Sequence, residues 1–520
     1  MDADDYTVIP VHLLDATVGN ADIVARVSIF FDAPLSFEKL QESWHQTLQA
    51  RPIMQARVRR STSAPSGLGY HVLTPEGMVK HLDRQARAPN HLKDFFCLDQ
   101  SHRSITDYYP GVGVSPNAPG QSRGVFVADG ADPLDQQHCT AFNGIKDLNE
   151  LISSDRPIAT IQVTRFNDAT LITVSVSHII GDLFTIKALL KAWERTLHGE
   201  APAPFEHLGR DPFRDYGPGG RLAGKDVMSN SPPLPPGWRV YGLVDKARFL
   251  SRFLWDCHIS RPEKSISQKY IFIPETEVKD LEQQARRDLV EVEQRRKQQG
   301  VEVQGPLVVS RSNILYAWIL KHNHAHLDSQ QWSSPVTISN ARAKPPTGMK
   351  ARSDDFPSND WYGASMVVAL PSVKVGELMS MSIGELSLHI REGTQEGSSP
   401  ENARRWLAFN LHHNLWKKPS GKFVFWSPPN HHWSGLSDWR LIRLQDLDLT
   451  PARLDQSRER VAICAFNSHM LLPGTQRDRW VCLGDTGGGT WLLGIASDLE
   501  WQNPRGFGKY PRLQRRASKL

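Results

Sequence analysis

The clearest alternation of apolar and polar positions in the chain spans residues 171–178 and ends at a histidine. Successive side chains of a strand point to opposite faces, so His178 continues an apolar face, that of Ile172, Val174 and Val176. Gly181 permits a tight turn after this strand. Apolar residues then recur every three or four positions from Leu183 to Thr196, which predicts an amphipathic helix. His178 therefore lies at a predicted strand-to-helix junction.

Elsewhere, short alternating segments and amphipathic stretches predict an α/β protein. The longest helical pattern, Thr276 to Gln299, has one apolar stripe and charges elsewhere, which is typical of a packed surface helix. Residues 199–238 are rich in proline and glycine, and we interpret them as a crossover between two lobes. A second irregular stretch, Tyr108 to Cys139, is expected to be a surface insertion.

Composition bounds the class of protein. With 520 residues and 39% hydrophobic content, the chain can form two large domains. The net charge of +5 lacks a sustained basic stripe, so nucleic acid is not an expected partner. Five scattered cysteines without a C-x-x-C pair favour a reducing compartment and no disulfide or zinc framework. No apolar run reaches membrane-spanning length.

The imidazole at the strand-to-helix junction is a candidate for a general base. A partly desolvated imidazole at a strand end is suited to accept a proton, and Asp182 follows His178 by four residues. Spacing alone leaves two interpretations open, a catalytic histidine or a buried histidine bonded to backbone. In a turn, the aspartate can also face away and pair with an arginine elsewhere.

The rest of the chain resembles the BAHD acyltransferases and their relatives, the peptide-synthetase condensation domains. His178 and Asp182 match the family's H-x-x-x-D, although Leu183 stands where a glycine often follows. A condensation domain would need a second histidine at Ser177. The opening strand, first helix and following turn of the family are matched by Phe30-Phe31-Asp32, Leu40 to Trp44 and Arg51 to Arg57, with Ala56 in place of the family glycine.

Two further segments carry the resemblance. Ser310 to Trp318 is similar to the family's serine-capped helix, which here could begin at Ser310 or Ser312. Val336 to Arg342 resembles the family strand that ends in N-x-R. By this resemblance, Arg342 forms a structural ion pair with Asp182.

The weakest of the matches to the family pattern lies nearer the carboxyl terminus. Ser437-Asp438-Trp439 resembles the family's S-W pair, and Asp448 follows the tryptophan at the family's spacing of nine residues. The family's phenylalanine and glycines after this aspartate are absent. Trp433-Ser434 competes for the same role. The resemblance implies that Trp439 or Ser437 stabilises the oxyanion and that Asp448 is structural at the active site.

These features predict two chloramphenicol-acetyltransferase-like lobes, each a mixed sheet with packed helices, and an active-site channel between them. The expected divisions are 1–198, the linker 199–238, and 239–520. The predicted reaction moves an acyl group from acyl-CoA to a hydroxyl, in preference to an amine, of a small natural product or glycolipid. His178 acts as general base, and no metal or other cofactor is expected. The alternatives are a stand-alone condensation-type amide former and a non-catalytic acyl-CoA- or lipid-binding homologue.

The last three residues, Ser518, Lys519 and Leu520, match the peroxisomal address that an import receptor recognises. Location in the peroxisome, otherwise in the cytoplasm, is therefore expected. Such an organelle would supply acyl-CoA on site. We expect a monomer.

Other motifs have simpler interpretations. Gly219 to Lys225 lacks the hydroxyl residue of a phosphate-binding loop, because Asp226 follows the lysine. His322, His324 and His326 alternate on a predicted helix, where alternate residues diverge, so a surface histidine cluster is favoured over a metal site. The three glycines 487–489 predict a hairpin turn.

Overall fold

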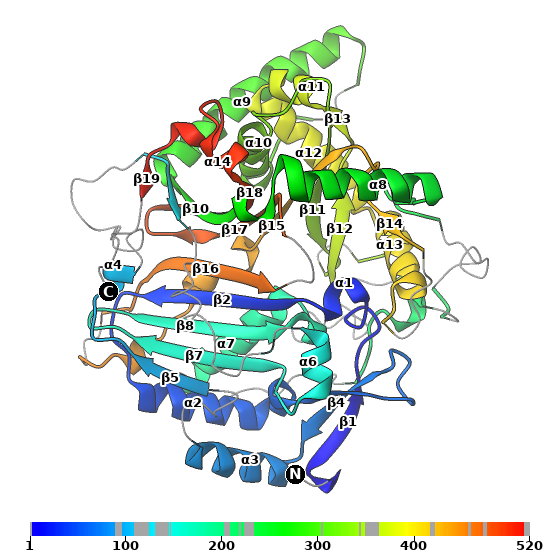
Figure 1. The fold of residues 1–520 in the computed structure, drawn as a ribbon. Coiled ribbons are helices and arrows are strands. Elements are labelled where there is room, and N and C mark those ends of the chain that lie inside the picture. Colours follow the sequence, from blue (N-terminus) through cyan, green and yellow to red (C-terminus); the bar gives the residue numbers. More distant parts are fainter. Residues whose placement is uncertain are drawn as a thin grey trace.

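The computed structural model describes residues 3–88, 96–108, 124–129, 145, 147–201, 209–217, 220–222, 233–302, 305–342, 345–348, 363–416, 422–455, 459–471 and 476–513. Two lobes are stacked on one another, each built on a sheet with packed helices (Figure 1). This arrangement confirms the predicted two-lobed α/β architecture. No helix in these ranges combines the length and apolarity needed to cross a bilayer.

The N-terminal lobe is built on five strands in the order β16, β2, β8, β7 and β5. Their bounds are Ile463–Leu471, Val24–Phe31, Thr170–Ser177, Ala159–Arg165 and Phe96–Gln100. Helices α2 (Phe37–Ala50) and α7 (Leu183–Leu197) pack together through Trp44 and Trp193, whose ring centres are 5.4 Å apart. Smaller elements complete the lobe: α1 (Val18–Ala21), α3 (Pro75–Arg87), α4 (Ile105–Tyr108), α6 (Leu148–Ser153) and the sheet of β1 (Tyr6–Pro10), β4 (Leu68–Leu73) and β3 (Arg57–Arg60).

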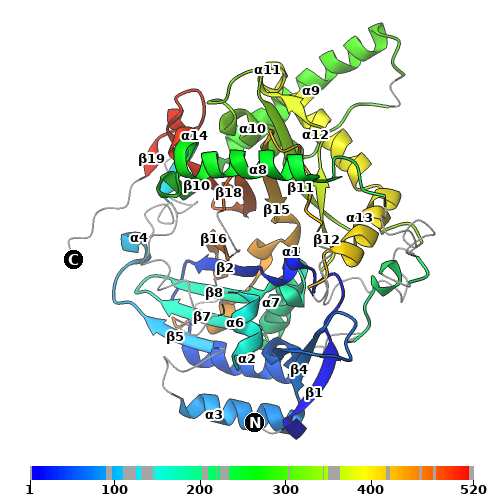
Figure 2. The same ribbon diagram turned by 45° about the vertical axis from the view of Figure 1, so that its right-hand side comes forward.

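The C-terminal lobe is built on a larger mixed sheet with the order β12, β11, β15, β17, β18, β10, β6 and β19. The bounds are Ser365–Ala369, Trp332–Asn340, His432–Asp438, Arg479–Thr486, Gly489–Ser497, Ile266–Pro274, Phe126–Asp129 and Arg512–Leu513, and β13 (Val373–Lys374) also pairs with β11. The lobe's helices, visible in Figure 2, are α8 (Leu243–Trp255), α9 (Glu275–Gln298), α10 (Arg311–Asn323), α11 (Val375–Ser380), α12 (Ile383–Gly397), α13 (Pro400–His413) and α14 (Asp498–Gln502).

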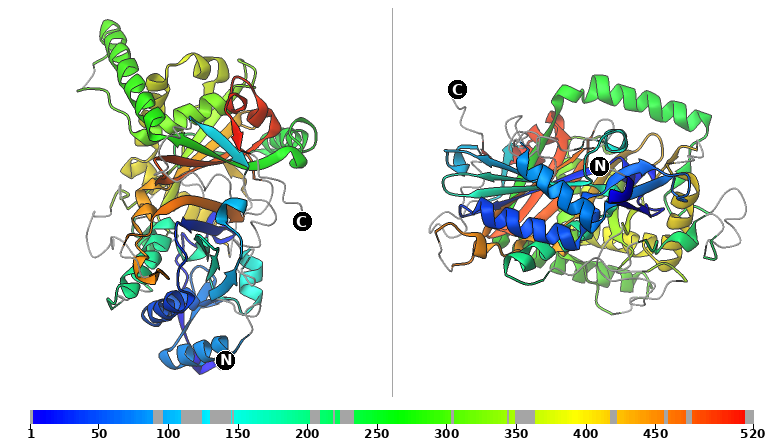
Figure 3. Two further views of the ribbon diagram at one scale, coloured as in Figure 1. Left: turned by 90° about the vertical axis from the view of Figure 1, so that its left-hand side faces the viewer. Right: turned by 90° about the horizontal axis from the view of Figure 1, so that it is seen from below.

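The two lobes exchange strands. β6 lies between β10 and β19 in the C-terminal sheet, although in sequence it falls between β5 and β7 of the N-terminal lobe. β16 comes from the last part of the chain and pairs antiparallel with β2 at the edge of the N-terminal sheet (Figure 3). The expectation that Tyr108 to Cys139 forms only a surface insertion is therefore wrong, because Phe126 and Val127 are buried in a sheet. The rest of that stretch, apart from residues 124–129, and much of the 199–238 linker lie outside the described residues.

The local predictions around the junction are confirmed. β8 ends at Ser177, a single turn spans His178–Ile180, and α7 begins at Leu183 with Asp182 as its N-cap. Gly181 has a φ of 136°, which a residue with a side chain rarely adopts. The serine-capped helix begins after Ser310, and the glycine turn joins β17 to β18 as a hairpin.

The histidines near the end of α10 are not a surface cluster. His322 and His324 are buried. His324 lies 3.0 Å from the Leu320 carbonyl through Nδ1 and 2.9 Å from the Ser333 hydroxyl through Nε2. Burial lowers the pKa of each to about 4, so both are neutral at pH 7. These two histidines can lie in the core because their ring nitrogens bond to backbone carbonyls and hydroxyl groups.

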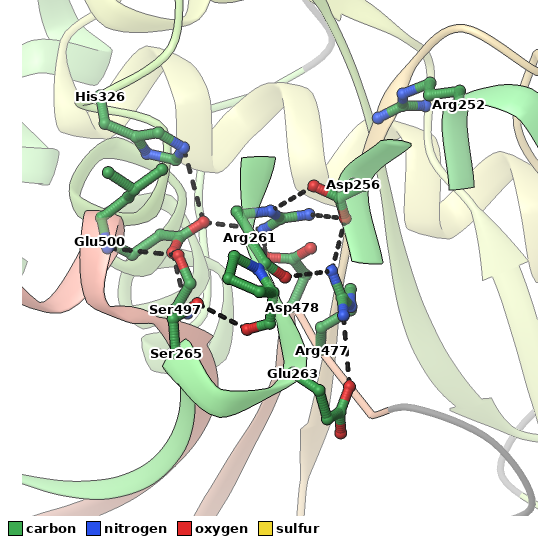
Figure 4. Close-up of polar contacts among 12 residues, drawn as sticks. Arg252, Asp256, Arg261, Glu263, Ser265, His326, Arg477, Asp478, Ser497 and Glu500 are labelled. Carbon is green, nitrogen blue, oxygen red and sulfur yellow. Dashed lines mark hydrogen bonds and ion pairs between the residues drawn. The ribbon is translucent and has the colours of Figure 1, made fainter. Parts of the chain in front are cut away.

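A buried ionic network joins several segments of the C-terminal lobe (Figure 4). Arg261 donates from Nε to Asp256 at 2.8 Å and from Nη1 to Asp478 at 2.8 Å and Glu500 at 2.7 Å. Arg477 also donates to Asp256, at 2.7 Å. The network connects the end of α8 to the start of β17 and to α14. Each buried guanidinium in it lies beside carboxylates, so the charges are largely matched within the interior.

Candidate functional site

His178 is fixed by the backbone on both sides. Its N–H donates to the Ile23 carbonyl at 2.8 Å, and its own carbonyl accepts from Gly181 at 3.1 Å. The next residue, Ile179, is held by the Tyr70 hydroxyl, which donates to its carbonyl at 2.5 Å. The imidazole is partly exposed, whereas its Nδ1 is buried without a hydrogen-bond partner among the described residues. The Nε2 edge of the ring is therefore the accessible edge.

Asp182 faces away from solvent and pairs with Arg342 across the two lobes. Arg342 Nη1 donates to Asp182 Oδ2 at 2.7 Å, and the two side chains are 7% and 3% exposed. The same oxygen accepts from the Ala364 amide and the Ser365 hydroxyl, each at 3.1 Å, while Oδ1 caps α7 by accepting from Phe184 at 3.0 Å. The ion pair expected from the family resemblance is present in the structure.

The charge state of Asp182 follows from these partners. Burial alone raises the pKa of a carboxyl, but the Arg342 charge, its hydrogen bond and the Ala364 amide outweigh burial and lower the pKa of Asp182. Asp182 is therefore ionised at neutral pH. With both oxygens engaged, it serves to hold the turn after His178 against β12, and it does not take the proton of a substrate.

A second carboxylate, Asp15, lies near the same turn. Its side chain is buried, and Oδ1 accepts from the Gly363 amide at 2.9 Å. A Cβ at Gly363 would lie 2.3 Å from this oxygen and 3.9 Å from the Cα of Gly181. Burial raises the pKa of Asp15 and outweighs His12 and a positive charge on His178, which lower it. The effect of His178 means that the carboxylate lies within electrostatic reach of the imidazole.

Sequence reasoning missed Asp15. The carboxylate belongs to a loop before the first strand of the N-terminal sheet, and its neighbour Gly363 is 348 residues away. His12 lies three residues before it, with Nδ1 at 3.5 Å from Asp15 Oδ2. A histidine and an aspartate three residues apart in a loop are too common to indicate a site, so no local pattern would have found this residue.

Ser437 and Trp439 are paired with each other. The Trp439 indole N–H donates to the Ser437 hydroxyl at 3.0 Å, and the Trp439 ring is buried in the core that includes the N-terminal sheet. No described contact joins either residue to His178 or Asp182. Their proposed part in stabilising an oxyanion stays a prediction. The competing Ser434 is buried on β15 and its hydroxyl has no partner among the described residues.

Asp448 lies at the far end of α7 from the histidine. Its amide donates to Glu194 at 2.9 Å, and its carbonyl accepts from His198 at 3.1 Å. The helix of 15 residues is about 22 Å long, and Asp182 caps its other end. Asp448 orders its own loop by accepting from the Thr450 amide at 2.9 Å. The expected placement at the active site is therefore corrected, because Asp448 is a structural residue remote from His178.

Comparisons with known proteins agree with this geometry. A sequence model described as the Transferase family matches residues 139–342, a segment that includes His178 and Asp182 and ends at Arg342. The chain is 34% identical to Acetyltransferase MATC1 of Mycosarcoma maydis over 526 residues, and 35% identical to Acetyltransferase MAT1 of Pseudozyma antarctica over 522 residues. Each alignment covers 98% of both proteins.

The fold is also similar to that of a solved enzyme. The crystal structure of TRI101 of F. sporotrichioides, complexed with coenzyme A and T-2, superimposes with a TM-score of 0.61 at 11% identity, covering 96% of this chain and 98% of that one. The chain belongs to the BAHD-like acyltransferase family. It is an acyl-CoA-dependent O-acyltransferase, and its co-substrate is a CoA thioester.

Proposed function

We propose that the protein is an O-acetyltransferase that moves an acetyl group from acetyl-CoA to a hydroxyl of a small natural product or glycolipid, with His178 as general base. The observation that carries this proposal is the orientation of His178, whose Nδ1 is buried while the other edge of the ring is accessible. The acetyl donor is supported by the names of relatives that are 34% and 35% identical over nearly the whole chain.

The reaction needs one proton acceptor and no covalent intermediate on the protein. The acceptor's hydroxyl oxygen attacks the thioester carbonyl carbon while Nε2 of His178 takes its proton. The tetrahedral intermediate collapses by breaking the carbon–sulfur bond, and the proton passes from His178 to the departing sulfur, giving an ester and free CoA. Such a base contributes about a hundred- to ten-thousand-fold in rate.

Asp15 and Asp182 support His178 in different ways, one by its charge and the other by holding the turn. In the neutral tautomer with a free Nε2 lone pair, Nδ1 carries the proton. The buried carboxylate of Asp15, within electrostatic reach of the ring, then stabilises the imidazolium that forms during attack. Asp182 holds the turn through Arg342. Ser437 or Trp439, with Ser434 as the competing donor, stabilises the oxyanion of the intermediate.

The first experiment measures free-thiol release from acetyl-CoA by the full-length protein, with extract of the source organism as the acceptor pool. Wild type should release CoA only when extract is present, and His178→Ala should lose this activity. The control is His389→Ala, a substitution of a partly exposed histidine on α12. Equal, trace release by all three proteins, together with acetyl-CoA binding, would replace this proposal with a non-catalytic binding protein.

Donor and acceptor classes are resolved in the same assay. Release that occurs with longer acyl-CoAs and fails with acetyl-CoA would contradict the acetyl donor. A hydroxyl acceptor gives a product that mild alkali cleaves, because esters hydrolyse under conditions in which amides persist. An alkali-stable product formed from an acyl-carrier substrate would instead identify a condensation-type amide former.

We also propose that the enzyme acts as a monomer in the peroxisome. The ion pair between Asp182 and Arg342 comes from one chain, so the junction is complete without a partner. Ser518, Lys519 and Leu520 lie outside the described residues, and the address they match is the support for import. A fluorescent fusion at the amino terminus should colocalise with a peroxisomal marker, and removal of these three residues should leave it in the cytoplasm.

A further inference from the structure

Helix α8 exposes an apolar face on the outside of the C-terminal lobe. None of its 13 residues is buried. Leu243 is 86% exposed, Leu250 55% and Leu254 46%. At about 100° per residue, these three leucines lie within about 40° of one another around the helix. Further exposed apolar residues widen this face on one side: Val244, Trp255 and, in the following turn, Ile259.

The opposite side of α8 is firmly anchored. The Phe249 ring lies 5.3 Å from Phe423 and 5.2 Å from Phe425, measured between ring centres. Arg252 donates from Nη1 to the carbonyl of His431, just before β15. The helix thus has apolar residues on both sides, and only the inner side packs on the protein. An exposed row of large apolar side chains on a fixed helix is unusual for a surface that faces only water.

Basic residues border the outer face. Lys246 lies about 40° beyond Leu250 on one side of the apolar arc, and Arg248 lies about 20° beyond Trp255 on the other. Neither cation lies within ion-pair distance of a carboxylate among the described residues. From Arg239 to Lys264 the chain carries six basic residues, against the three acidic residues Asp245, Asp256 and Glu263. Asp256 is already paired with Arg261 and Arg477.

We propose that the outer face of α8 binds the surface of a membrane that carries anionic lipids. The helix would lie in the plane of the headgroups, with the leucines and Trp255 in the apolar boundary and the two cations beside lipid phosphates. Leucine and tryptophan on one face with lysine and arginine beside it are typical of helices that bind in this way. Figures 1 and 3 show α8 at the periphery of the lobe, where a flat surface can approach it.

A second copy of the chain is a poorer occupant. Two α8 faces packed together would bring Lys246 and Arg248 of each copy close to the same residues of the other, and like charges in a partly dry interface repel. An anionic surface instead gains from the same cations. The inference goes beyond the proposed reaction and does not depend on it.

The test is flotation of the full-length protein with vesicles of phosphatidylcholine alone and of phosphatidylcholine mixed with phosphatidylserine. Wild type should float with the anionic vesicles, and the double variant Leu250→Glu/Leu254→Glu should bind at least about tenfold more weakly. The matched control is Val79→Glu on α3, which replaces an aliphatic residue that is 63% exposed elsewhere. Unchanged melting temperatures show that all variants fold.

The charge contribution is tested separately. Lys246→Gln/Arg248→Gln should weaken binding to the anionic vesicles, and so should raising the salt from about 0.15 M to about 1 M, which shortens the Debye length from about 8 Å to about 3 Å. Three results would overturn the proposal: no flotation with either vesicle, binding that the leucine substitutions leave unchanged, or equal binding to neutral and anionic vesicles. Concentration-dependent dimers that Leu254→Glu dissociates would assign the face to a second copy.

Discussion

Two buried clusters of charge, one at the junction of the lobes and one inside the C-terminal lobe, use the same residue types for different ends. Around Arg261, one guanidinium meets three carboxylates that belong to the same lobe, within 2.8 Å. Around His178, the Asp182–Arg342 pair joins one lobe to the other, and an imidazole nitrogen nearby is buried without a partner.

The difference between the clusters lies in whether a proton acceptor is left accessible. In the Arg261 network the three carboxylates accept from the guanidinium, so the network holds segments together and offers no free acceptor for a substrate proton. The junction cluster also engages its carboxylates but leaves the Nε2 edge of His178 accessible. The buried Nδ1 of the same ring has no described partner, which costs stability. Substitutions should therefore separate the clusters into one that affects activity and one that affects stability.

The largest effect is expected for His178→Ala. Loss of the base should lower kcat by about a hundred- to ten-thousand-fold, with little change in the melting temperature because the imidazole makes no described side-chain hydrogen bond. Steady-state kinetics with acetyl-CoA and thermal melts measure the two quantities. A variant that keeps more than about a tenth of wild-type kcat would contradict the role of His178.

Arg261→Met should show the opposite pattern. Removing the guanidinium leaves Asp478 and Glu500 without their partner in the interior, which should lower the free energy of unfolding by about 3–5 kcal/mol. Urea denaturation measures this change, and kcat per folded molecule should stay at the wild-type value. The comparison variant Arg342→Met should lose both stability and kcat. If Arg261→Met also lowered kcat, the division between the clusters would be incorrect.

The pH dependence of stability should report on buried neutral histidines such as His324. His324 is neutral when buried, with its pKa lowered to about 4 from 6.5, whereas the unfolded chain takes up a proton below pH 6.5. Stability should therefore fall by up to about 3 kcal/mol as pH decreases from 6.5 to 4. His324→Gln should remove the share of the loss that comes from His324, and the substitution His389→Gln, at a partly exposed histidine, should leave the loss unchanged. Urea midpoints across this range provide the measurement.

Asp182 acts in a lower window of pH. Its folded pKa lies below the value of 3.8 for an unfolded aspartate, so its contribution is complete above that pH and is lost as pH falls below it. The two windows thus report on different kinds of group, buried neutral histidines in the upper window and paired carboxylates in the lower one. A wild-type protein whose stability were constant between pH 6.5 and 4 would contradict the buried neutral state of His324.

The smallest effect is expected for Asp15→Asn. Asparagine can still accept from the Gly363 amide but lacks the charge that stabilises an imidazolium, so kcat should fall about tenfold. Because the charged ring becomes less favourable, the acidic limb of the pH profile of kcat/KM should move to lower pH. A purely structural role would lower activity without moving that limb, and Asp15→Ala measures the added cost of losing the hydrogen bond.

Sequence patterns predicted the parts of the site that are local. The alternation before His178, the turn at Gly181 and the stripe of α7 all arise from neighbouring residues, and each element has the expected bounds within two residues. The partnership of Asp182 with Arg342 spans 160 residues, and only the family resemblance indicated it.

The features that sequence reasoning missed depend on distant contacts. Asp15 is buried and accepts a hydrogen bond from the distant Gly363 amide. The strand β6 is recognisable only from its pairing with β10 and β19. Asp448 was misplaced because a match in spacing does not tell which end of a helix a loop approaches. Strand pairing and burial between remote segments are set by the tertiary fold, so the pattern of one segment carries little information about them.

The exchanged strand β16 constrains how the molecule reaches its folded state. During synthesis, β2 has no antiparallel neighbour on one side until residues 463–471 leave the ribosome, long after β2 itself. All residues of β2 are buried in the folded protein, so its open edge can pair with a wrong strand during that interval. We therefore expect a chain that stops before β16 to leave this edge of β2 open and to aggregate.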